Sequence, residues 1–176
     1  MTVKTVQKID FTGKRILAWG REIDATCIVR NEENGWRQPW QVVYTMGSTT
    51  PHDLPYQPRP FPSGLHEITR VADMPLDSVY WPTWIDTEAT QELTVWDLDD
   101  EDMYRRPTRR TVLGRGYGIH HARFRKGRKL VPSNTTLGCI NVLSPDDAIW
   151  LGKQIREAFA HRLHVFFDVP EWGEWE

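Results

Sequence analysis

Two residues in the C-terminal half of the chain, Cys139 and His120, pair a nucleophile with a general base. A cysteine thiolate is a strong nucleophile, and a neighbouring imidazole is able to take the thiol proton. Gly138 precedes the cysteine, and a glycine there lets a substrate approach the backbone closely. Backbone N–H groups of Gly138 and Cys139 would then form an oxyanion hole, so this segment predicts acyl transfer through a thioester.

Further polar residues surround this pair in the sequence. The candidates for binding a substrate are Tyr117, His121, Thr136, Asn141, Arg123 and Arg125. The two arginines belong to a basic stretch, 122–130, for which two interpretations stay open: a solvated lid, or a pocket for substrate carboxylates. His121 is either an outward-facing loop residue or a polar group of the site, and spacing alone leaves it open as the base.

The pattern along the chain predicts a mainly β fold of the α+β class, with one principal helix after Cys139. Ser144 is a good N-cap before Pro145, and apolar residues then recur at three- and four-residue steps as far as Phe159. If the N-terminus of this helix pointed back at the thiolate, it would lower the pKa of Cys139. Strand-like runs cover 15–19, 25–29, 40–45, 65–71, 117–120 and 164–169, whereas 48–64 is a proline-rich loop and 72–110 is irregular.

The composition limits the possible classes of protein. A length of 176 residues predicts one compact domain, which we place over 1–176. The 22 basic and 24 acidic residues leave a net charge of -2, which argues against a dedicated nucleic-acid binder. There is no apolar run long enough for a membrane span, and no signal-peptide core follows the first residue. Metal-ligand spacings do not occur either, so we expect neither a metal nor a cofactor.

Cysteine and tryptophan usage adds two smaller expectations. Cys27 and Cys139 are too few for a disulfide scaffold, and Cys139 already has a chemical role. Tryptophan is frequent, with nine in the chain, so large aromatic side chains must fill either the core or a binding groove. The candidates for lining such a groove are Trp36, Trp40, Trp81 and Trp84.

The order and spacing of these residues resemble the catalytic domain of the L,D-transpeptidases, which remodel bacterial peptidoglycan. In that family a histidine, often within Tyr-Gly-Ile-His, is followed after a spacer by Ser/Thr-His-Gly-Cys, an apolar residue and Asn or Arg. This chain has Tyr-Gly-Ile-His at 117–120, fifteen intervening residues, and Thr-Leu-Gly-Cys-Ile-Asn at 136–141. Upstream, 59–68 is similar to a family segment in which Gly64 and Ile68 hold matching places. The resemblance covers roughly residues 10–168.

The resemblance implies a β-sandwich of mixed sheets and an enzyme in which His120 deprotonates Cys139. The context Tyr-Gly-Ile favours His120 over His121 as the base. The thiolate would attack the carbonyl of a diamino-acid residue in a peptidoglycan stem peptide and expel the terminal D-alanine. An amine acceptor would then give a cross-link or an exchanged D-amino acid, and water would give L,D-carboxypeptidase cleavage.

Leu137 departs from the family pattern, which has a histidine two positions before the cysteine. One alternative is therefore a catalytically weakened module that binds peptidoglycan or a protein. Another is a cysteine acyltransferase that acts on a peptide outside peptidoglycan. Activity on peptidoglycan implies the periplasm or cell envelope, reached by secretion as an effector, by phage lysis or with a signal already removed. Activity on another peptide implies the cytoplasm.

Overall fold

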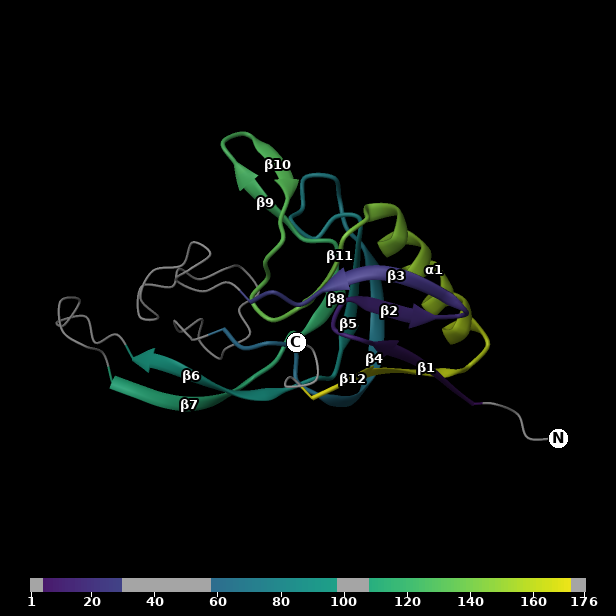
Figure 1. Ribbon diagram of the computed structural model, residues 1–176, viewed down its shortest axis with the longest axis horizontal. Coiled ribbons are helices and arrows are strands. Elements are labelled where there is room, and N and C mark those ends of the chain that lie inside the picture. Colours follow the sequence, from purple (N-terminus) through teal and green to yellow (C-terminus); the bar gives the residue numbers. More distant parts are fainter. Residues whose placement is uncertain (1–4, 30–57, 98–107, 172–176) are drawn as a thin grey trace.

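Residues 5–29, 58–97 and 108–171 are described by the computed structural model, and they are mostly strands with one helix, as predicted. The strands of the main sheet are β1 (Val6–Phe11), β2 (Arg15–Ala18), β3 (Arg21–Thr26), β4 (Gly64–Asp73), β5 (Thr83–Thr87), β8 (Gly118–His120), β11 (Ile140–Val142) and β12 (His164–Val169). Within the described ranges they close into a mixed barrel in the order β1-β12-β4-β5-β8-β11-β3-β2 (Figure 1). The pairs β1–β12 and β8–β11 are parallel, and the other pairs are antiparallel.

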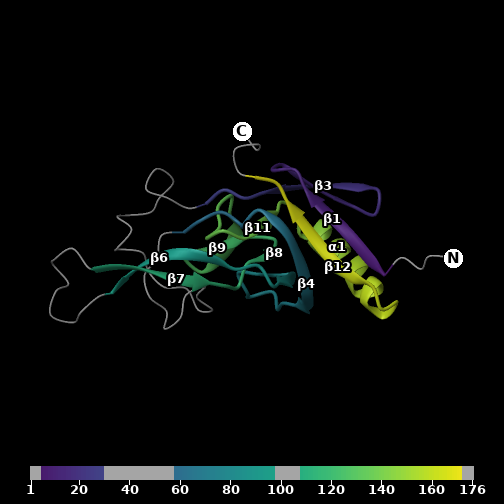
Figure 2. The ribbon, with the colours of Figure 1, turned by 90° about the horizontal axis from the view of Figure 1, so that it is seen from below.

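Two ribbons extend from the barrel. One consists of β6 (Gln91–Asp97) and β7 (Thr108–Gly114), and the other of β9 (Arg123–Lys126) and β10 (Lys129–Pro132). The β6–β7 ribbon extends to the side opposite the N-terminus (Figures 1 and 2), and the β9–β10 ribbon projects from the top of the molecule in Figure 1. The prediction that 72–110 is irregular is wrong, because β5, β6 and the start of β7 lie there. The alternation of Leu93 and Val95 with polar residues is strand-like, but an acidic run directly follows it in the sequence.

Other predicted elements are found with small shifts. The strand predicted at 65–71 is β4, the strand at 164–169 is β12, and the strand at 25–29 begins earlier, as β3. Trp19 and Gly20, both with positive φ, turn the chain between β2 and β3. The predicted strand at 40–45 and most of the proline-rich loop at 48–64 lie outside the described residues.

Three neighbouring strands contribute their inner faces to the core of the barrel. Ile85, Ile119 and Ile140 lie side by side on β5, β8 and β11, and none of them is exposed. Because side chains alternate between the faces of a sheet, the residues beside these isoleucines point to the outer face. This alternation determines which polar side chains of β8 and β11 meet outside the core.

The helix α1 (Pro145–Ala160) packs on the same core through β4, β5, β11 and β12. Its buried residues are Ala148, Leu151, Gly152, Ile155 and Ala158, which follow the predicted apolar spacing. Ser144 has the extended N-cap conformation and Pro145 opens the helix, although the Ser144 hydroxyl makes no capping hydrogen bond. In the described part of the chain, no helix is long and apolar enough to cross a membrane.

A short segment before β4 enters the core through Phe61, which is completely buried. Its ring contacts those of Tyr117, Phe167 and His66, with centroids 5.8, 5.5 and 5.5 Å away. Aromatic pairs at such distances add to the free energy gained from burial. Phe61 thus packs this segment against β4, β12 and Tyr117, which directly precedes β8.

Replacing Phe61 with alanine should lower the free energy of unfolding by about 3–5 kcal/mol, because it leaves a cavity in the core. Urea denaturation of the purified protein measures this change. Phe124→Ala is the matched control, since Phe124 lies on β9 and is 40% exposed; we expect a change within about 0.5 kcal/mol. Equal stability of the two variants would contradict the role of Phe61.

Candidate active site around Cys139

Cys139 directly precedes β11, and His120 ends the neighbouring parallel strand β8. Asn141 lies opposite His120 in the register of these strands, which puts Gly118 opposite Cys139. Alternation of side chains then places Cys139 and His120 on the same outer face, two residues or about 7 Å apart along the strand direction. The fold therefore places the predicted nucleophile and the predicted base on one face of the sheet.

The thiol of Cys139 is partly buried against the backbone at the start of β8. Gly118 N–H donates to Sγ at 3.5 Å, and Sγ lies 3.9 Å from the carbonyl oxygen of Gly116. Burial raises the pKa of Cys139 to about 11, the Gly118 N–H opposes this rise, and the Asp86 carboxylate adds to it. The resting thiol is therefore protonated at neutral pH.

Helix α1 does not offset this rise in the pKa. The helix begins at Pro145, after β11 and two further residues, whereas Cys139 lies before β11. An extended strand of that length separates the helix N-terminus from the thiol by more than about 10 Å. The influence of a helix end is limited to its first turn, so the expected help from this helix is not found.

The imidazole of His120 is enclosed by aromatic rings and is only 5% exposed. It stacks on Trp84, with ring centroids 5.1 Å apart, and meets the Tyr80 ring at 87° and 5.0 Å. Nδ1 lies 3.1 Å from the carbonyl oxygen of His121. We assign the ring hydrogen to Nδ1, because a carbonyl only accepts, which leaves the lone pair of Nε2 available to take a proton. Burial lowers the pKa of His120 to about 4, so this ring is neutral at pH 7.

Gly138 shapes the loop that carries the nucleophile. Its φ is 126°, and an added Cβ would come within 2.3 Å of the carbonyl oxygen of Arg59 and 2.9 Å of the Tyr117 ring. Gly138 N–H donates to Thr136 Oγ1 at 3.1 Å, and that hydroxyl donates to the carbonyl of Cys139 at 2.7 Å. The Gly138 N–H is thus engaged within the loop, in place of the expected role as an oxyanion donor. The N–H directed at the sulfur is that of Gly118, which sequence reasoning missed.

Asn141 connects the active-site strand to the β9–β10 ribbon. Its Oδ1 accepts from Ala122 N–H at 2.9 Å, and its Nδ2 donates to the carbonyl of Ser133 at 2.8 Å. Ala122 and Ser133 are also joined by a backbone hydrogen bond. Asn141 is only 1% exposed, so its amide is used to hold both ends of the ribbon.

His121 does not face outward. It is 2% exposed, which makes that interpretation wrong, and its Nδ1 lies 2.9 Å from the carbonyl oxygen of Val142. Its Nε2 is buried without a hydrogen-bond partner. The ring of His121 thus contacts the end of β11, whereas that of His120 lies between Trp84 and Tyr80.

The basic stretch 122–130 forms the β9–β10 ribbon, and its two candidate arginines have different surroundings. The guanidinium of Arg123 donates to the carbonyls of Leu76 and Ser78 and lies 4.8 Å above the Trp81 ring. Arg125 is exposed on β9. Arg123 therefore holds the segment before β5 in place, and Arg125 faces solvent.

Two of the four tryptophans proposed to line a groove are described. Trp84 stacks on His120, and Trp81 lies under Arg123. Both side chains therefore lie over the outer face of β5 and β8. Trp36 and Trp40 lie outside the described residues.

Leu137, where the family pattern has a histidine, joins an apolar cluster. It packs against Leu93 and Val95 of β6, as Val112 of β7 also does. The base of this ribbon is also tied to the segment before β4, since Gln91 donates to the carbonyl of Pro60 at 2.6 Å. An apolar residue at 137 thus attaches the active-site loop to the β6–β7 ribbon.

Cys27 supports the loop from the core side. Thr26 lies opposite Asn141 on β3, so Cys27 points inward, away from the face that carries Cys139. Its Sγ donates to the carbonyl of Gly138 at 3.4 Å, and burial raises its pKa to about 12. Both cysteines are free thiols, and their opposite orientations are unsuited to a bridge.

Asp86 is a second residue that the sequence did not single out. It lies opposite Gly118 on β5, so Asp86, Gly118 and Cys139 form one row across three strands. The row depends on the pairing of β5 with β8, for which the local sequence carries no signal. Arg70 lies 3.6 Å from the Asp86 carboxylate.

Gly138→Ala should slow the reaction of Cys139 with iodoacetamide or abolish soluble folding, because the new Cβ meets the Arg59 backbone. Gly20→Ala is the matched control: Gly20 also has a positive φ, of 72°, but nothing lies within 4 Å of an added Cβ. The control should lose about 1 kcal/mol from backbone strain alone. Mass spectrometry of the alkylated protein and thermal unfolding provide the two measurements. Equal effects of the two substitutions would refute a packing role for Gly138.

The alkylation rate of Cys139 should depend strongly on pH. Only the thiolate reacts, and the pKa of Cys139 is raised to about 11, so the thiolate fraction grows with each step in pH below that value. We expect about a tenfold faster rate per pH unit between about pH 7 and 9, followed by mass spectrometry with Cys139→Ala as the background. A rate that is constant below pH 8 would mean a thiolate already formed at rest.

Comparison with known proteins identifies the family of the chain. A family model, YkuD, described as the L,D-transpeptidase catalytic domain, matches residues 24–160. No curated protein and no solved structure gives a significant match to the chain. The matched region contains β5, β8, β11, all of α1 and all the residues of the candidate site. The chain belongs to the YkuD family of L,D-transpeptidase catalytic domains, which acts on peptidoglycan.

Proposed function

We propose that the protein is a cysteine acyltransferase that acts on peptidoglycan stem peptides through a thioester on Cys139. The observation that carries this proposal is the placement of Cys139 and His120 on one outer face of the parallel pair β8–β11. The lone pair of His120 Nε2 is available because Nδ1 is held by the carbonyl of His121. The family supplies the substrate class, since it acts on peptidoglycan.

The resting forms of the two groups determine the order of the steps. The thiol is protonated and the imidazole neutral, because burial raises the pKa of Cys139 and lowers that of His120. The proton therefore moves to Nε2 as Sγ attacks the carbonyl carbon of the diamino-acid residue. The Gly118 N–H, which already points at Sγ, supports the negative charge that develops there.

Collapse of the tetrahedral intermediate completes the acylation. The C–N bond to the terminal D-alanine breaks, and the departing amine takes the proton from His120. A buried imidazolium between Tyr80 and Trp84 is costly, which favours this delivery over a lasting charge. An amine or water then attacks the thioester and gives transfer or cleavage. On peptidoglycan, this chemistry would take place in the cell envelope.

The other predicted site residues take supporting roles in this proposal. Thr136 and Gly138 fix the loop that carries the thiol, and Tyr117 packs against Gly138. Asn141 holds the β9–β10 ribbon beside the site. Of the two candidate arginines, Arg125 has the exposure needed to meet a stem-peptide carboxylate.

A binding module without catalysis is the second candidate, and one observation favours it. The raised pKa of Cys139 leaves little thiolate at neutral pH. In this case the outer face of β8 and β11 would bind stem peptides, and the thiol would remain unacylated.

Incubation with tetrapeptide muropeptides, followed by mass spectrometry, tests both candidates. We expect shortened or D-amino-acid-exchanged products with the wild-type protein and an acyl-enzyme mass on Cys139. Cys139→Ala should lose at least about a thousandfold in rate, whereas Cys27→Ser, which replaces the other thiol with a hydroxyl able to keep the hydrogen bond to the Gly138 carbonyl, should retain product formation. If Cys139→Ala formed the same products as the wild type, the acyltransferase proposal would be contradicted. Muropeptide binding without any acyl-enzyme in the wild type would favour the binding module.

A further inference from the structure

The β9–β10 ribbon carries a concentrated positive charge on a projecting part of the molecule (Figure 1). Among the described residues, its two strands pair only with each other. The sequence has no acidic residue between Asp102 and Asp146, and the ribbon lies within this stretch. Positive charge is therefore gathered locally in a chain whose net charge is -2. The exposed cations of the ribbon are Arg125, Lys126, Arg128 and Lys129.

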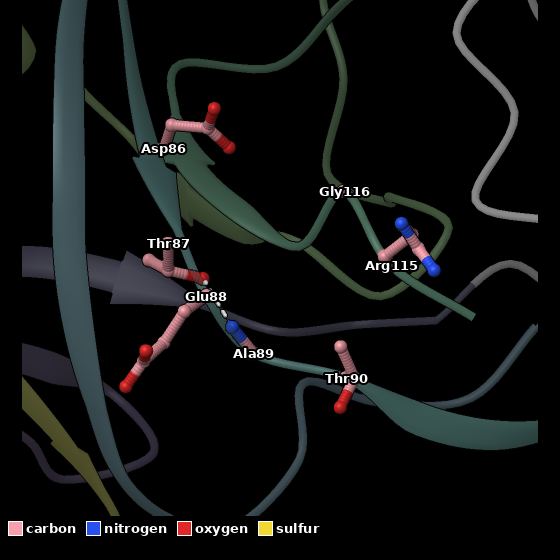
Figure 3. A pocket seen from close by; sticks show the side chains of 7 residues that line it. All are labelled: Asp86, Thr87, Glu88, Ala89, Thr90, Arg115 and Gly116. Atoms are coloured by element: carbon pink, nitrogen blue, oxygen red, sulfur yellow. Dashed lines mark hydrogen bonds between the residues drawn. The ribbon is translucent and has the colours of Figure 1, made fainter. Parts of the chain in front are cut away.

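The four cations of the ribbon lack carboxylate partners. No ion pair joins any of them to a carboxylate in the ranges that the structure describes. Arg115, an exposed arginine of the same stretch, has different surroundings. It lines a pocket of about 420 Å³ to which Asp86 and Glu88 also contribute (Figure 3). The charge of the ribbon, unlike that of the pocket, is thus available to an anionic partner.

The register of the ribbon puts two of its lysines directly opposite each other. Lys126 pairs with Lys129, and Phe124 pairs with Val131. Because side chains alternate along a strand, both lysines lie on the same face of the ribbon as Phe124 and Val131. Like charges that lie directly opposite across two strands destabilise the pairing. An anion bound over this face would remove that repulsion.

The face with the two lysines also exposes an aromatic ring, because Phe124 is 40% exposed. Arg123 lies on the other face, and its guanidinium donates to the carbonyls of Leu76 and Ser78. The Phe124 face is therefore directed away from this neighbouring segment. Cations alone are enough to attract a soluble polyanion. An apolar ring among them is suited to the boundary between lipid headgroups and acyl chains.

We propose that the Phe124 face of the β9–β10 ribbon binds an anionic membrane surface. Lys126 and Lys129 would contact the phosphates of the lipid headgroups, and the Phe124 ring would enter the interfacial layer between them. The proposal is independent of acylation at Cys139. Asn141 holds both ends of the ribbon, so a ribbon bound in this way would keep the outer face of β8 and β11 near the membrane.

Sedimentation with lipid vesicles tests the proposal. The wild type should bind vesicles made of equal parts phosphatidylglycerol and phosphatidylcholine, more weakly as sodium chloride is added, and should not bind pure phosphatidylcholine. Lys126→Gln/Lys129→Gln should lower the partition coefficient about thirtyfold, because two cations are lost from the surface. Lys14→Gln/Lys153→Gln is the matched control, since it removes two exposed lysines outside the ribbon; it should retain binding.

Two further measurements separate a membrane site from loss of folding and from a site for any polyanion. Lys126→Gln/Lys129→Gln should unfold at a temperature no lower than the wild type, because the repulsion between the lysines is removed. Phe124→Ala should lower vesicle binding at least about threefold and leave binding of soluble polyphosphate unchanged. Full vesicle binding by the lysine variant, or equal binding of the wild type to both vesicle types, would overturn the proposal. Unchanged vesicle binding by Phe124→Ala, with equal affinity of the wild type for polyphosphate, would also overturn it.

Discussion

The parallel pairing of β8 with β11 is the constraint on which the site depends. One register places Asn141 opposite His120 and Gly118 opposite Cys139. A slip by one residue would turn the imidazole or the thiol into the core, because side chains alternate along a strand. The isoleucines of β5, β8 and β11 oppose such a slip, since each is completely buried. The apolar core thus fixes the relative position of the two reactive groups on the opposite face.

The loop before β11 is held by contacts that arrive from distant parts of the chain. The carbonyl of Arg59 fills the space beside Gly138, Cys27 binds the Gly138 carbonyl, and Leu137 is packed on the β6–β7 ribbon. These contacts bring three separate sequence regions to one short loop. The conformation of the nucleophile is therefore a property of the whole fold rather than of its local sequence.

The local sequence pattern predicted those elements whose formation depends mainly on residues close together in the sequence. The apolar spacing and the Ser144–Pro145 start gave helix α1, and alternation gave β4 and β12. Cys139 and His120 could be selected as candidates because the chemistry of a thiol and an imidazole follows directly from the residue type. Asp86 and the Gly118 N–H could not be found in this way, because their proximity to Cys139 arises from strand pairing across the barrel. The position of helix α1 relative to Cys139 likewise depends on the topology of the fold. For that reason the helix does not lower the pKa of Cys139 in the way the sequence suggested.

The burial of Cys139 has a consequence for its oxidation. Oxidation of cysteine to sulfenic and higher acids proceeds through the thiolate. A thiol whose pKa is raised to about 11 exposes very little thiolate to peroxides at neutral pH. Where reducing systems are scarce, a thiol that stays protonated at rest would resist damage that a permanent thiolate would suffer.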